Sequence, residues 1–276
     1  MKYATFIHQG QQLTGIIDPE GQTVQPLAFD MVTIIQKGPM FQGPVLPLSA
    51  VRLLAPIPNP PHNVICVGKN YHEHLKEVSH TAPSGDSVPE YPIFFTKAST
   101  CIIGPNEPII LPTHLSQKID YEAELAVIIG KRAKNISESN AAEYIFGYMI
   151  ANDVTARDVQ KRHQQWFLGK SLDGFLPTGP WIVTADEVNA HDLTIRCWVN
   201  QELRQQASTA SMIFSIPKLL QTLTAGMTLE AGDIVITGTP AGVGMGFNPP
   251  RFLKNGDNIR IEISQLGILI NTVVGT

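Results

Sequence analysis

Short apolar runs, bounded by glycine, proline and polar residues, recur along the whole chain and are typical of β-strands. In the second half, Gly232 and Gly256 each precede an aspartate. An apolar run follows the first pair and alternating polar and apolar residues follow the second, and both patterns predict a turn followed by a strand. The clearest expected strands cover residues 3–7, 14–17, 232–236 and 256–261. The pattern therefore predicts a chain that is rich in β-structure.

Two segments carry helical patterns instead. Apolar residues recur at helical spacing after Ser215, Pro217 suits a first turn, and Gly226 is expected to end this helix. A shorter helix is expected through residues 141–144, with serines before it as caps and a stop near Gly147. The balance predicts an α+β protein that is mainly β, with a few helices.

A proline-rich run at residues 56–61 is expected to mark a domain edge. We predict a small N-terminal β-rich domain over residues 1–58 and a main, catalytic domain over residues 59–276. Within the latter, the polar, breaker-rich segment 80–91 has the composition of a loop that covers a site. The alternative for this segment is a surface loop without a role.

Composition excludes several functional classes. The chain has 276 residues, 43% of them hydrophobic and 16% charged, and its formal net charge is −4. Its lysines and arginines form no basic stripe, which argues against nucleic acid as a partner. No apolar run approaches the roughly 18 residues that span a bilayer. The three cysteines, Cys66, Cys101 and Cys197, are widely spaced, which argues against a disulfide framework or a zinc site and fits a cytoplasmic location.

An acidic stretch, DYEAE at residues 120–124, leads directly into the apolar run 125–129. Side chains two apart on a strand point the same way, so Glu122 and Glu124 are expected to present two carboxylates from one face. Close carboxylates repel one another unless a cation lies between them, and Mg²⁺ and Ca²⁺ prefer carboxylate oxygen. The alternative is an edge strand whose glutamates face water.

Asp153 is a third candidate ligand. It follows the apolar residues 148–151 and Asn152, where a buried strand is expected to emerge. Three carboxylates leave coordination positions for water or substrate, as Mg²⁺ usually requires. An aspartate in this place can instead be a turn or helix cap.

His74 and Glu77 lie in the polar segment 68–77, after an apolar run. If this segment is helical, the two side chains are neighbours on one face. A glutamate beside a histidine orients the imidazole and raises its basicity, which gives a base for activating water. A zinc site lacks the cysteines or histidine spacing it needs, and a solvated polar helix is the remaining alternative.

Three further features add candidate ligand-binding groups. Lys170 lies between two glycines and can stabilise an enolate or bind a carboxylate. Arg157, four residues after Asp153, can pair with a carboxylate or clamp an anionic substrate. The glycine-rich segment 237–244 can hold an anion with its backbone N–H groups, but it lacks the pattern of a nucleotide-binding loop.

Taken in order, these segments resemble the fumarylacetoacetate hydrolase family, from about Val64 to Val274. The motifs that carry the resemblance are VGKNY at 67–71 with His74 and Glu77, FTK at 95–97, DYEAE at 120–124, NDVTARD at 152–158, GKS at 169–171, MIF at 212–214 and GTPAGVG at 238–244. Their number and order make the resemblance specific. It implies a mixed β-sheet roll with a small N-terminal domain, and usually a homodimer.

The resemblance also implies roles for the site residues. Glu122, Glu124 and Asp153 are expected to bind Mg²⁺, or sometimes Mn²⁺ or Ca²⁺. His74 and Glu77 are expected to form a water-activating dyad.

The same likeness assigns a cationic role beside the metal to Lys170. Contacts to a small-molecule 2-oxo acid substrate are expected from Lys97, Arg157, Gln160 and Thr239.

These roles predict a Mg²⁺-dependent hydrolase that cleaves a carbon–carbon bond in acylpyruvate-type 2,4-dioxo acids through a metal-bound enolate. The alternative is an isomerase, tautomerase or decarboxylase of 2-oxo or 2-hydroxy-dienoic acids, of the hydroxyhepta-dienedioate or oxaloacetate type. A module that binds a chelated oxo acid without turnover would not require the histidine–glutamate base or Lys170. The sequence thus indicates the shared enolate chemistry more clearly than the bond that breaks.

Overall fold

A computed structural model describes residues 1–78 and 88–275 of the chain. Strands dominate it, so the predicted fold, mainly β with a few helices, is confirmed. The loop expected over residues 80–91 lies mostly outside the described residues, since only 88–91 fall within them.

The largest sheet combines the N-terminal strands with strands from the middle of the chain, in the order β4-β3-β2-β1-β14-β12-β11-β17-β6-β7, with β5 beside β1 and β8 beside β14. Its strands are β1 (Lys2–His8), β2 (Gln11–Ile17), β3 (Thr23–Leu27), β4 (Leu46–Pro47), β5 (Arg52–Leu53), β6 (Val64–Gly68), β7 (Ile93–Lys97), β8 (Ile102–Ile103), β11 (Ala123–Ile129), β12 (Ile145–Asn152), β14 (Leu176–Thr184) and β17 (Ile234–Ile236).

A second sheet has the order β16-β15-β18-β19-β9, and β10 pairs with β13 separately. These strands are β9 (Ile109–Leu111), β10 (Ile119–Asp120), β13 (Thr155–Ala156), β15 (Thr194–Val199), β16 (Glu202–Ser208), β18 (Asn258–Ile263) and β19 (Gly267–Gly275). All four strands that the sequence predicted most clearly are present, and none of their ends is shifted by more than three residues.

Five α-helices accompany the sheets within the described part of the chain: α1 (Met31–Lys37), α2 (His72–Val78), α3 (Arg157–Arg162), α4 (Phe167–Lys170) and α5 (Ile216–Gly226). Helix α5 has the predicted bounds, with Ser215 as its N-cap and a proline in its first turn. The shorter expected helix is a 3₁₀ helix at Glu138–Tyr144, capped by Ser137. It ends before Gly147, which lies inside β12 because the chain there enters the buried sheet.

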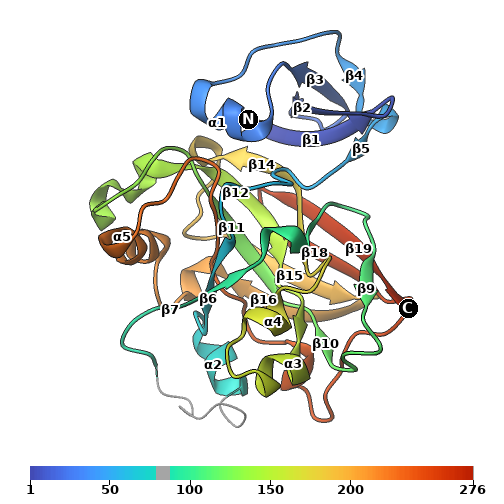
Figure 1. The fold of residues 1–276 in the computed structure, drawn as a ribbon, viewed down its shortest axis with the longest axis vertical. Coiled ribbons are helices and arrows are strands. Elements are labelled where there is room, and N and C mark those ends of the chain that lie inside the picture. Colours follow the sequence, from blue (N-terminus) through green and yellow to red (C-terminus); the bar gives the residue numbers. More distant parts are fainter. Residues whose placement is uncertain (79–87, 276) are drawn as a thin grey trace.

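The N-terminal strands and α1 form a separate lobe at the top of Figure 1. This lobe has a small apolar core of Ala4, Phe6, Ile17 and Val24. It is nevertheless joined to the rest of the protein by a strand pair, because β1 lies antiparallel to β14.

The centre of the main sheet positions the polar residues of interest. Every residue of β11 is buried, and the strand lies between β12 and β17, antiparallel to both. This pairing puts the beginning of β11 beside the end of β12, with Ala123 opposite Asn152. Helices α2, α3 and α4 lie in the same lower part of the molecule, below the N-terminal lobe (Figure 1).

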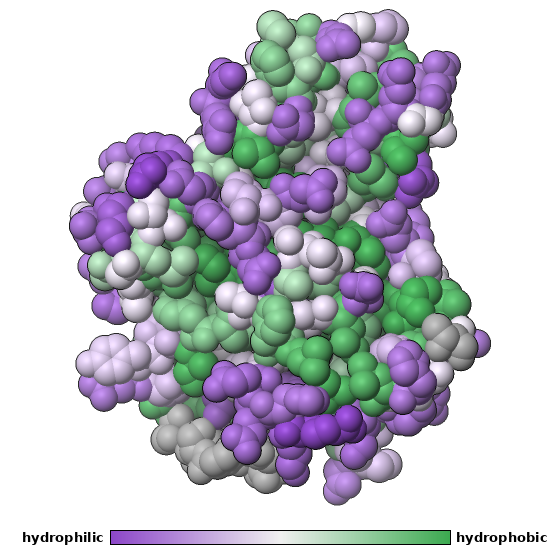
Figure 2. Space-filling model, viewed as in Figure 1, coloured by the Kyte–Doolittle hydropathy of each residue, from purple (hydrophilic) through white to green (hydrophobic). Residues whose placement is uncertain are grey.

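The surface is mixed, with polar residues interrupted by apolar patches (Figure 2). Exposed apolar side chains on β9 and β19 include Ile110, Ile268 and Val274. Within the described residues, no helix is both long and apolar enough to cross a membrane.

Candidate active site

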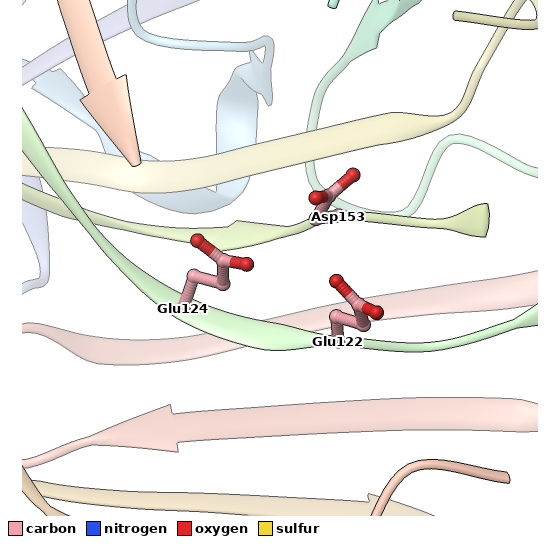
Figure 3. Close-up of side chains that lie close together, drawn as sticks. All are labelled: Glu122, Glu124 and Asp153. Carbon is pink, nitrogen blue, oxygen red and sulfur yellow. The ribbon is translucent and has the colours of Figure 1, made fainter. Parts of the chain in front are cut away.

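Three buried carboxylates meet where β11 begins and β12 ends. Glu122 and Glu124 extend from one strand toward Asp153 on the neighbouring segment (Figure 3). One oxygen from each side chain lies within 4.8 Å of the others, and all three residues are buried. The structure thus brings together the three ligands that the sequence predicted, in the same-face arrangement expected for Glu122 and Glu124.

Backbone hydrogen bonds fix this meeting point. The Asp153 N–H donates to the Glu122 carbonyl at 2.8 Å, and the Glu122 N–H donates to Asn152 Oδ1 at 3.0 Å. Because β11 and β12 are antiparallel, these contacts extend their pairing past the ends of both strands. The two segments that carry the acidic residues therefore cannot separate without losing buried hydrogen bonds.

Lys170, at the end of α4, lies between two of the carboxylates. Its Nζ is 2.7 Å from Glu122 Oε2 and 2.6 Å from Asp153 Oδ2. Burial lowers the pKa of Lys170, but the charges of Asp153 and Glu122 outweigh this effect and raise the pKa above its ordinary value. The Lys170 ammonium also lies 5.2 Å from the centre of the Phe95 ring. It is thus held as a cation inside the cluster.

Lys97, expected to contact substrate, lies behind Asp153 and is fully buried. Its Nζ donates to Asp153 Oδ1 at 2.8 Å, to the Val154 carbonyl at 3.1 Å and to the Lys170 carbonyl. Lys97 is not among the residues that line the adjacent cleft. Its contacts are those of a residue that supports Asp153 and the end of α4.

Arg157, at the start of α3, links the acidic stretch to the cluster. Its Nη2 lies 2.6 Å from Glu122 Oε1, and its Nε donates to Asp120 Oδ2 at 2.9 Å. Gln160 accepts from Arg157 Nη1 at 3.4 Å. The guanidinium therefore pairs with the protein's own carboxylates, one of the two roles expected for it.

The carboxylates differ in how their charges are balanced. Burial raises the pKa of Glu122, but Lys170 and Arg157 outweigh burial and hold the pKa well below its ordinary value. For Glu124, burial and the nearby charges of Asp153 and Glu122 raise the pKa well above its ordinary value. Its Oε2 accepts from the Gly238 N–H at 2.7 Å, and no ion pair to Glu124 occurs among the described residues.

This imbalance fits a divalent cation. Within the described residues, the site has four buried carboxylates, those of Asp120, Glu122, Glu124 and Asp153, and their ion pairs involve three cations, those of Lys97, Arg157 and Lys170. A hard cation bound to Glu122, Glu124 and Asp153 would supply the positive partner that Glu124 does not have among the described residues. The donor set contains only oxygen, which Mg²⁺ and Ca²⁺ prefer.

His74 and Glu77 lie on one face of α2, as expected from their spacing. His74 Nδ1 is 3.1 Å from Glu77 Oε2, and both side chains are mostly buried. Because a carboxylate only accepts hydrogen bonds, this contact assigns the proton of a neutral His74 to Nδ1. Nε2 is then the nitrogen that can accept a proton.

One cleft of about 1340 Å³ connects these groups. His74, Glu122, Glu124, Arg157 and Lys170 all contribute to its wall. Two further expected substrate contacts, Gln160 and Thr239, also line it. Three predicted site residues do not line the cleft. Glu77 contacts His74 on the side away from it, and Asp153 and Lys97 lie deeper in the protein.

Several basic and aromatic side chains line the rest of this wall, together with Asp158 and a number of uncharged residues. The aromatic ones include Phe95 and Trp166, whose rings meet edge to face with centroids 5.2 Å apart. The basic residues beyond the cluster are Lys69, Lys118, Lys161 and Arg162. The cleft is thus cationic although the protein as a whole is acidic.

Two supporting residues were not predicted from the sequence. Asp120 was part of the acidic stretch, but its role as a partner of Arg157 was not predicted. Gln205, buried on β16, accepts from the Ala123 N–H at 3.0 Å and donates to Thr239 Oγ1 and the Pro240 carbonyl, both at 2.8 Å. One glutamine in the largely polar strand ELRQQAS gave no signal of this role, because its partners are distant in sequence.

Comparison with known families gives two matches. Residues 63–274 match the model described as fumarylacetoacetate (FAA) hydrolase C-terminal, and residues 1–56 match the one described as Rv2993c-like, N-terminal. Together they extend over nearly the whole chain.

Individual proteins are similar over most of their length. Oxaloacetate tautomerase YisK of Bacillus subtilis is 49% identical over 227 residues, which is 82% of this chain and 74% of the relative. Human mitochondrial oxaloacetate tautomerase FAHD2A is 44% identical over 236 residues, 84% of this chain and 73% of the relative.

Solved structures show the same fold. A fumarylacetoacetate hydrolase from Exiguobacterium antarcticum superposes with a TM-score of 0.89 at 43% identity, covering 100% of both chains. A 2-hydroxyhepta-2,4-diene-1,7-dioate isomerase from Mycobacterium marinum gives a TM-score of 0.85 at 37% identity, covering 100% of this chain and 99% of the other.

Proposed function

Because the chain belongs to the fumarylacetoacetate hydrolase family, we propose that it is a divalent-metal-dependent tautomerase or isomerase of 2-oxo dicarboxylic acids of the oxaloacetate type. The sequence analysis gave this activity as the alternative to acylpyruvate hydrolysis. The similar proteins favour the alternative, since they include oxaloacetate tautomerases and a hydroxyhepta-dienedioate isomerase.

The observation that carries the proposal is that a base and a buried cation share one cleft with the carboxylate cluster. Tautomerisation of a 2-oxo acid requires a group that takes a proton from C3 and a positive environment for the charge that develops on the 2-oxygen. His74 with Glu77 fits the first role, and Lys170 fits the second.

In the proposed reaction, His74 Nε2 takes the C3 proton while Glu77 holds the imidazole through Nδ1. A proton is added at the 2-oxygen, for which the Lys170 ammonium is a donor beside Glu122 and Asp153. The substrate loses one proton and gains one, so its composition is unchanged. The enzyme is restored when His74 releases its proton to solvent and Lys170 takes one up. A divalent cation held by Glu122, Glu124 and Asp153, Mg²⁺ or else Mn²⁺ or Ca²⁺, supplies Lewis-acid polarisation when bound.

The cationic wall favours a substrate with a second carboxylate. Lys69, Lys118, Lys161 and Arg162 line the cleft beyond the cluster, and a positive cleft concentrates anionic ligands. An acylpyruvate with an uncharged acyl group would leave this feature unused. We therefore propose that Arg157, Gln160 and Thr239 contact the oxo-acid end, and that the basic residues receive the distal carboxylate.

Hydrolysis of an acylpyruvate is the second candidate. It is favoured by the close structural likeness to the fumarylacetoacetate hydrolase from Exiguobacterium antarcticum and by the dyad, which can activate water as well as move a C3 proton. In this reaction water attacks the distal carbonyl, the bond between C3 and C4 breaks, and pyruvate and the carboxylic acid of the acyl group are released.

A substrate panel separates the two. Purified protein is incubated with Mg²⁺ and oxaloacetate, a hydroxyhepta-dienedioate, acetylpyruvate or fumarylpyruvate, while enol absorbance and pyruvate are followed together. We expect catalysed keto–enol interconversion of oxaloacetate without release of pyruvate. Pyruvate release from the acylpyruvates, with no acceleration of interconversion, would contradict the proposal and support hydrolysis.

Homodimerisation and a cytoplasmic location remain predictions. Light scattering during size-exclusion chromatography tests the first, since a dimer has twice the 30.2 kDa mass of the chain. Fractionation of the source cells tests the second.

A further inference from the structure

The glycine-rich segment around residues 238–246 binds carboxylates that belong to the protein itself. The sequence of residues 237–244 predicted that backbone N–H groups there can hold an anion. In the structure, the N–H groups of this segment and of Met245 hold three carboxylates. The contacts are Gly238 N to Glu124 Oε2 at 2.7 Å, Gly242 N to Glu77 Oε1 at 2.9 Å, Gly244 N to Asp120 Oδ1 at 2.6 Å and Met245 N to Asp120 Oδ2 at 3.0 Å.

Each of the three carboxylates belongs to a different part of the site. Glu124 is a predicted metal ligand, and Glu77 orients His74. Asp120 orients Arg157, which in turn pairs with Glu122. One short segment thus contacts a predicted metal ligand, the carboxylate that orients the base and the carboxylate that orients the arginine.

The position of Glu77 depends on the absence of a side chain at Gly246. A Cβ placed on Gly246 would lie 2.0 Å from Glu77 Oε1, 2.2 Å from Cδ and 2.4 Å from Cγ. The φ angle of Gly246 is not positive, so its backbone is not left-handed. Conformation alone therefore does not require glycine here, whereas the space taken by the Glu77 side chain does.

We infer that residues 238–246 are a positioning element for the carboxylates of the site, and that Gly246 is the positioning residue that admits Glu77 to its place beside His74. The kinetic part of this inference rests on the proposed tautomerase function, but the geometric part does not. Gly246 touches no reacting atom in this account; it acts through Glu77.

The test uses Gly246→Ala, with Glu77→Ala for comparison and Gly226→Ala as the matched control. Gly226 also lacks a left-handed φ, and a Cβ there meets no atom within 4 Å. The new methyl group at position 246 meets the far end of a flexible side chain, so Glu77 is expected to move while the fold is kept.

The primary readout is the tautomer of His74, which is independent of activity. In ¹⁵N-histidine-labelled protein, correlations from the carbon-bound ring protons show which nitrogen carries the proton, and His74→Asn assigns the signals. We expect the Nδ1–H form in the unchanged protein and in Gly226→Ala. In Gly246→Ala and Glu77→Ala this form is lost. Retention of the Nδ1–H form in Gly246→Ala overturns the inference.

A second readout covers the case in which Gly246→Ala folds poorly. Glu77→Ala removes all three atoms that the new methyl group would meet. The double variant Glu77→Ala/Gly246→Ala is therefore expected to fold even where Gly246→Ala alone does not. Its Tm should differ from that of Glu77→Ala by less than about 2 °C, whereas an overpacked site typically loses several degrees. If the double variant is as poorly folded as Gly246→Ala alone, the inference is wrong.

The kinetic readout separates positioning from general damage. With oxaloacetate and Mg²⁺, Gly246→Ala is expected to lower kcat by about 10²–10⁴-fold, the usual effect of losing a positioned base. The double variant should be no slower than Glu77→Ala, because both changes remove the same contact. Additive losses in kcat would contradict this. If the unchanged protein lacks tautomerase activity, the proposed function fails, and the tautomer measurement still decides the inference.

Discussion

Lys97 and Asp153 form an ion pair in which neither side chain is exposed, with Lys97 Nζ 2.8 Å from Asp153 Oδ1. The other oxygen of Asp153 pairs with Lys170. Asp153 is thus held from both sides by cations, one behind it and one facing the cleft. This arrangement gives a predicted metal ligand two ion-pair partners in a buried position, where an unpaired carboxylate would be costly.

Replacing Lys97 by methionine keeps its length and removes its charge. We expect a loss of about 3–5 kcal/mol in the free energy of unfolding, because breaking one side of a buried pair leaves an uncompensated charge. Urea unfolding measures this loss. Lys218→Met is the control, since that lysine pairs with Glu138 on the surface and should cost less than about 1 kcal/mol. Equal losses in both variants would contradict the role of Lys97.

Lys170→Met is expected to separate metal binding from catalysis. The ammonium occupies oxygens of Glu122 and Asp153, so its removal should leave Mg²⁺ affinity unchanged or higher. The kcat for oxaloacetate interconversion should fall by about 10²–10³-fold, as when one stabilising donor is lost from an active site. Calorimetric titration with Mg²⁺ and steady-state kinetics test the two parts. A variant that turns over normally would exclude Lys170 from the reaction.

Gln205→Leu tests the support beneath the acidic strand. The change leaves the Ala123 N–H without its partner and removes both donations to the segment at Thr239 and Pro240. An unsatisfied buried group costs about 1–3 kcal/mol, which unfolding measurements can detect. Gln206→Leu, at the exposed neighbouring position, is the control and should change stability by less than about 0.5 kcal/mol.

Asp30 gives a pH-dependent contribution to the stability of the N-terminal lobe. Burial raises its pKa, but hydrogen bonds from the Thr33 N–H and hydroxyl outweigh burial and hold the pKa below its ordinary value. Since the folded pKa is the lower one, this contribution is present above the unfolded pKa of about 3.9 and is lost as pH falls through the folded pKa.

Asp30→Ala should therefore cost about 0.5–2 kcal/mol at neutral pH, as expected for a lost N-cap, and progressively less in acid. Unfolding at a series of pH values measures the difference. Asp30→Asn keeps a capping oxygen that does not titrate and is the control. A cost of Asp30→Ala that is constant down to pH 2 would be inconsistent with this assignment.

The sequence was most informative where local pattern decides structure. Helix α5 has its cap, its apolar spacing and its closing glycine within eleven residues and their neighbours, and its predicted bounds are correct. Glu122 and Glu124 are likewise placed on one side by strand geometry alone. In both cases neighbouring residues contain the required information.

Other features depend on contacts that are distant in sequence. Lys97 was expected to contact substrate, but its burial follows from the packing of β7 against the chain around Asp153 and Lys170. Gln205 and Gly246 have partners 82 and 169 residues away, at Ala123 and Glu77. No local pattern distinguishes such residues from ordinary polar or turn positions.

The central claim is that the carboxylates of Glu122, Glu124 and Asp153 hold a divalent cation that activates a 2-oxo dicarboxylic acid. The most direct measurement is the decay of enol-oxaloacetate absorbance during a Mg²⁺ titration of the unchanged protein and of Glu124→Gln. Glu143→Gln, an exposed glutamate paired with Lys131, is the control. We predict that Mg²⁺ accelerates the decay in the unchanged protein and in the control, and that Glu124→Gln shows only the uncatalysed rate. Equal activation of Glu124→Gln by Mg²⁺ would contradict the account.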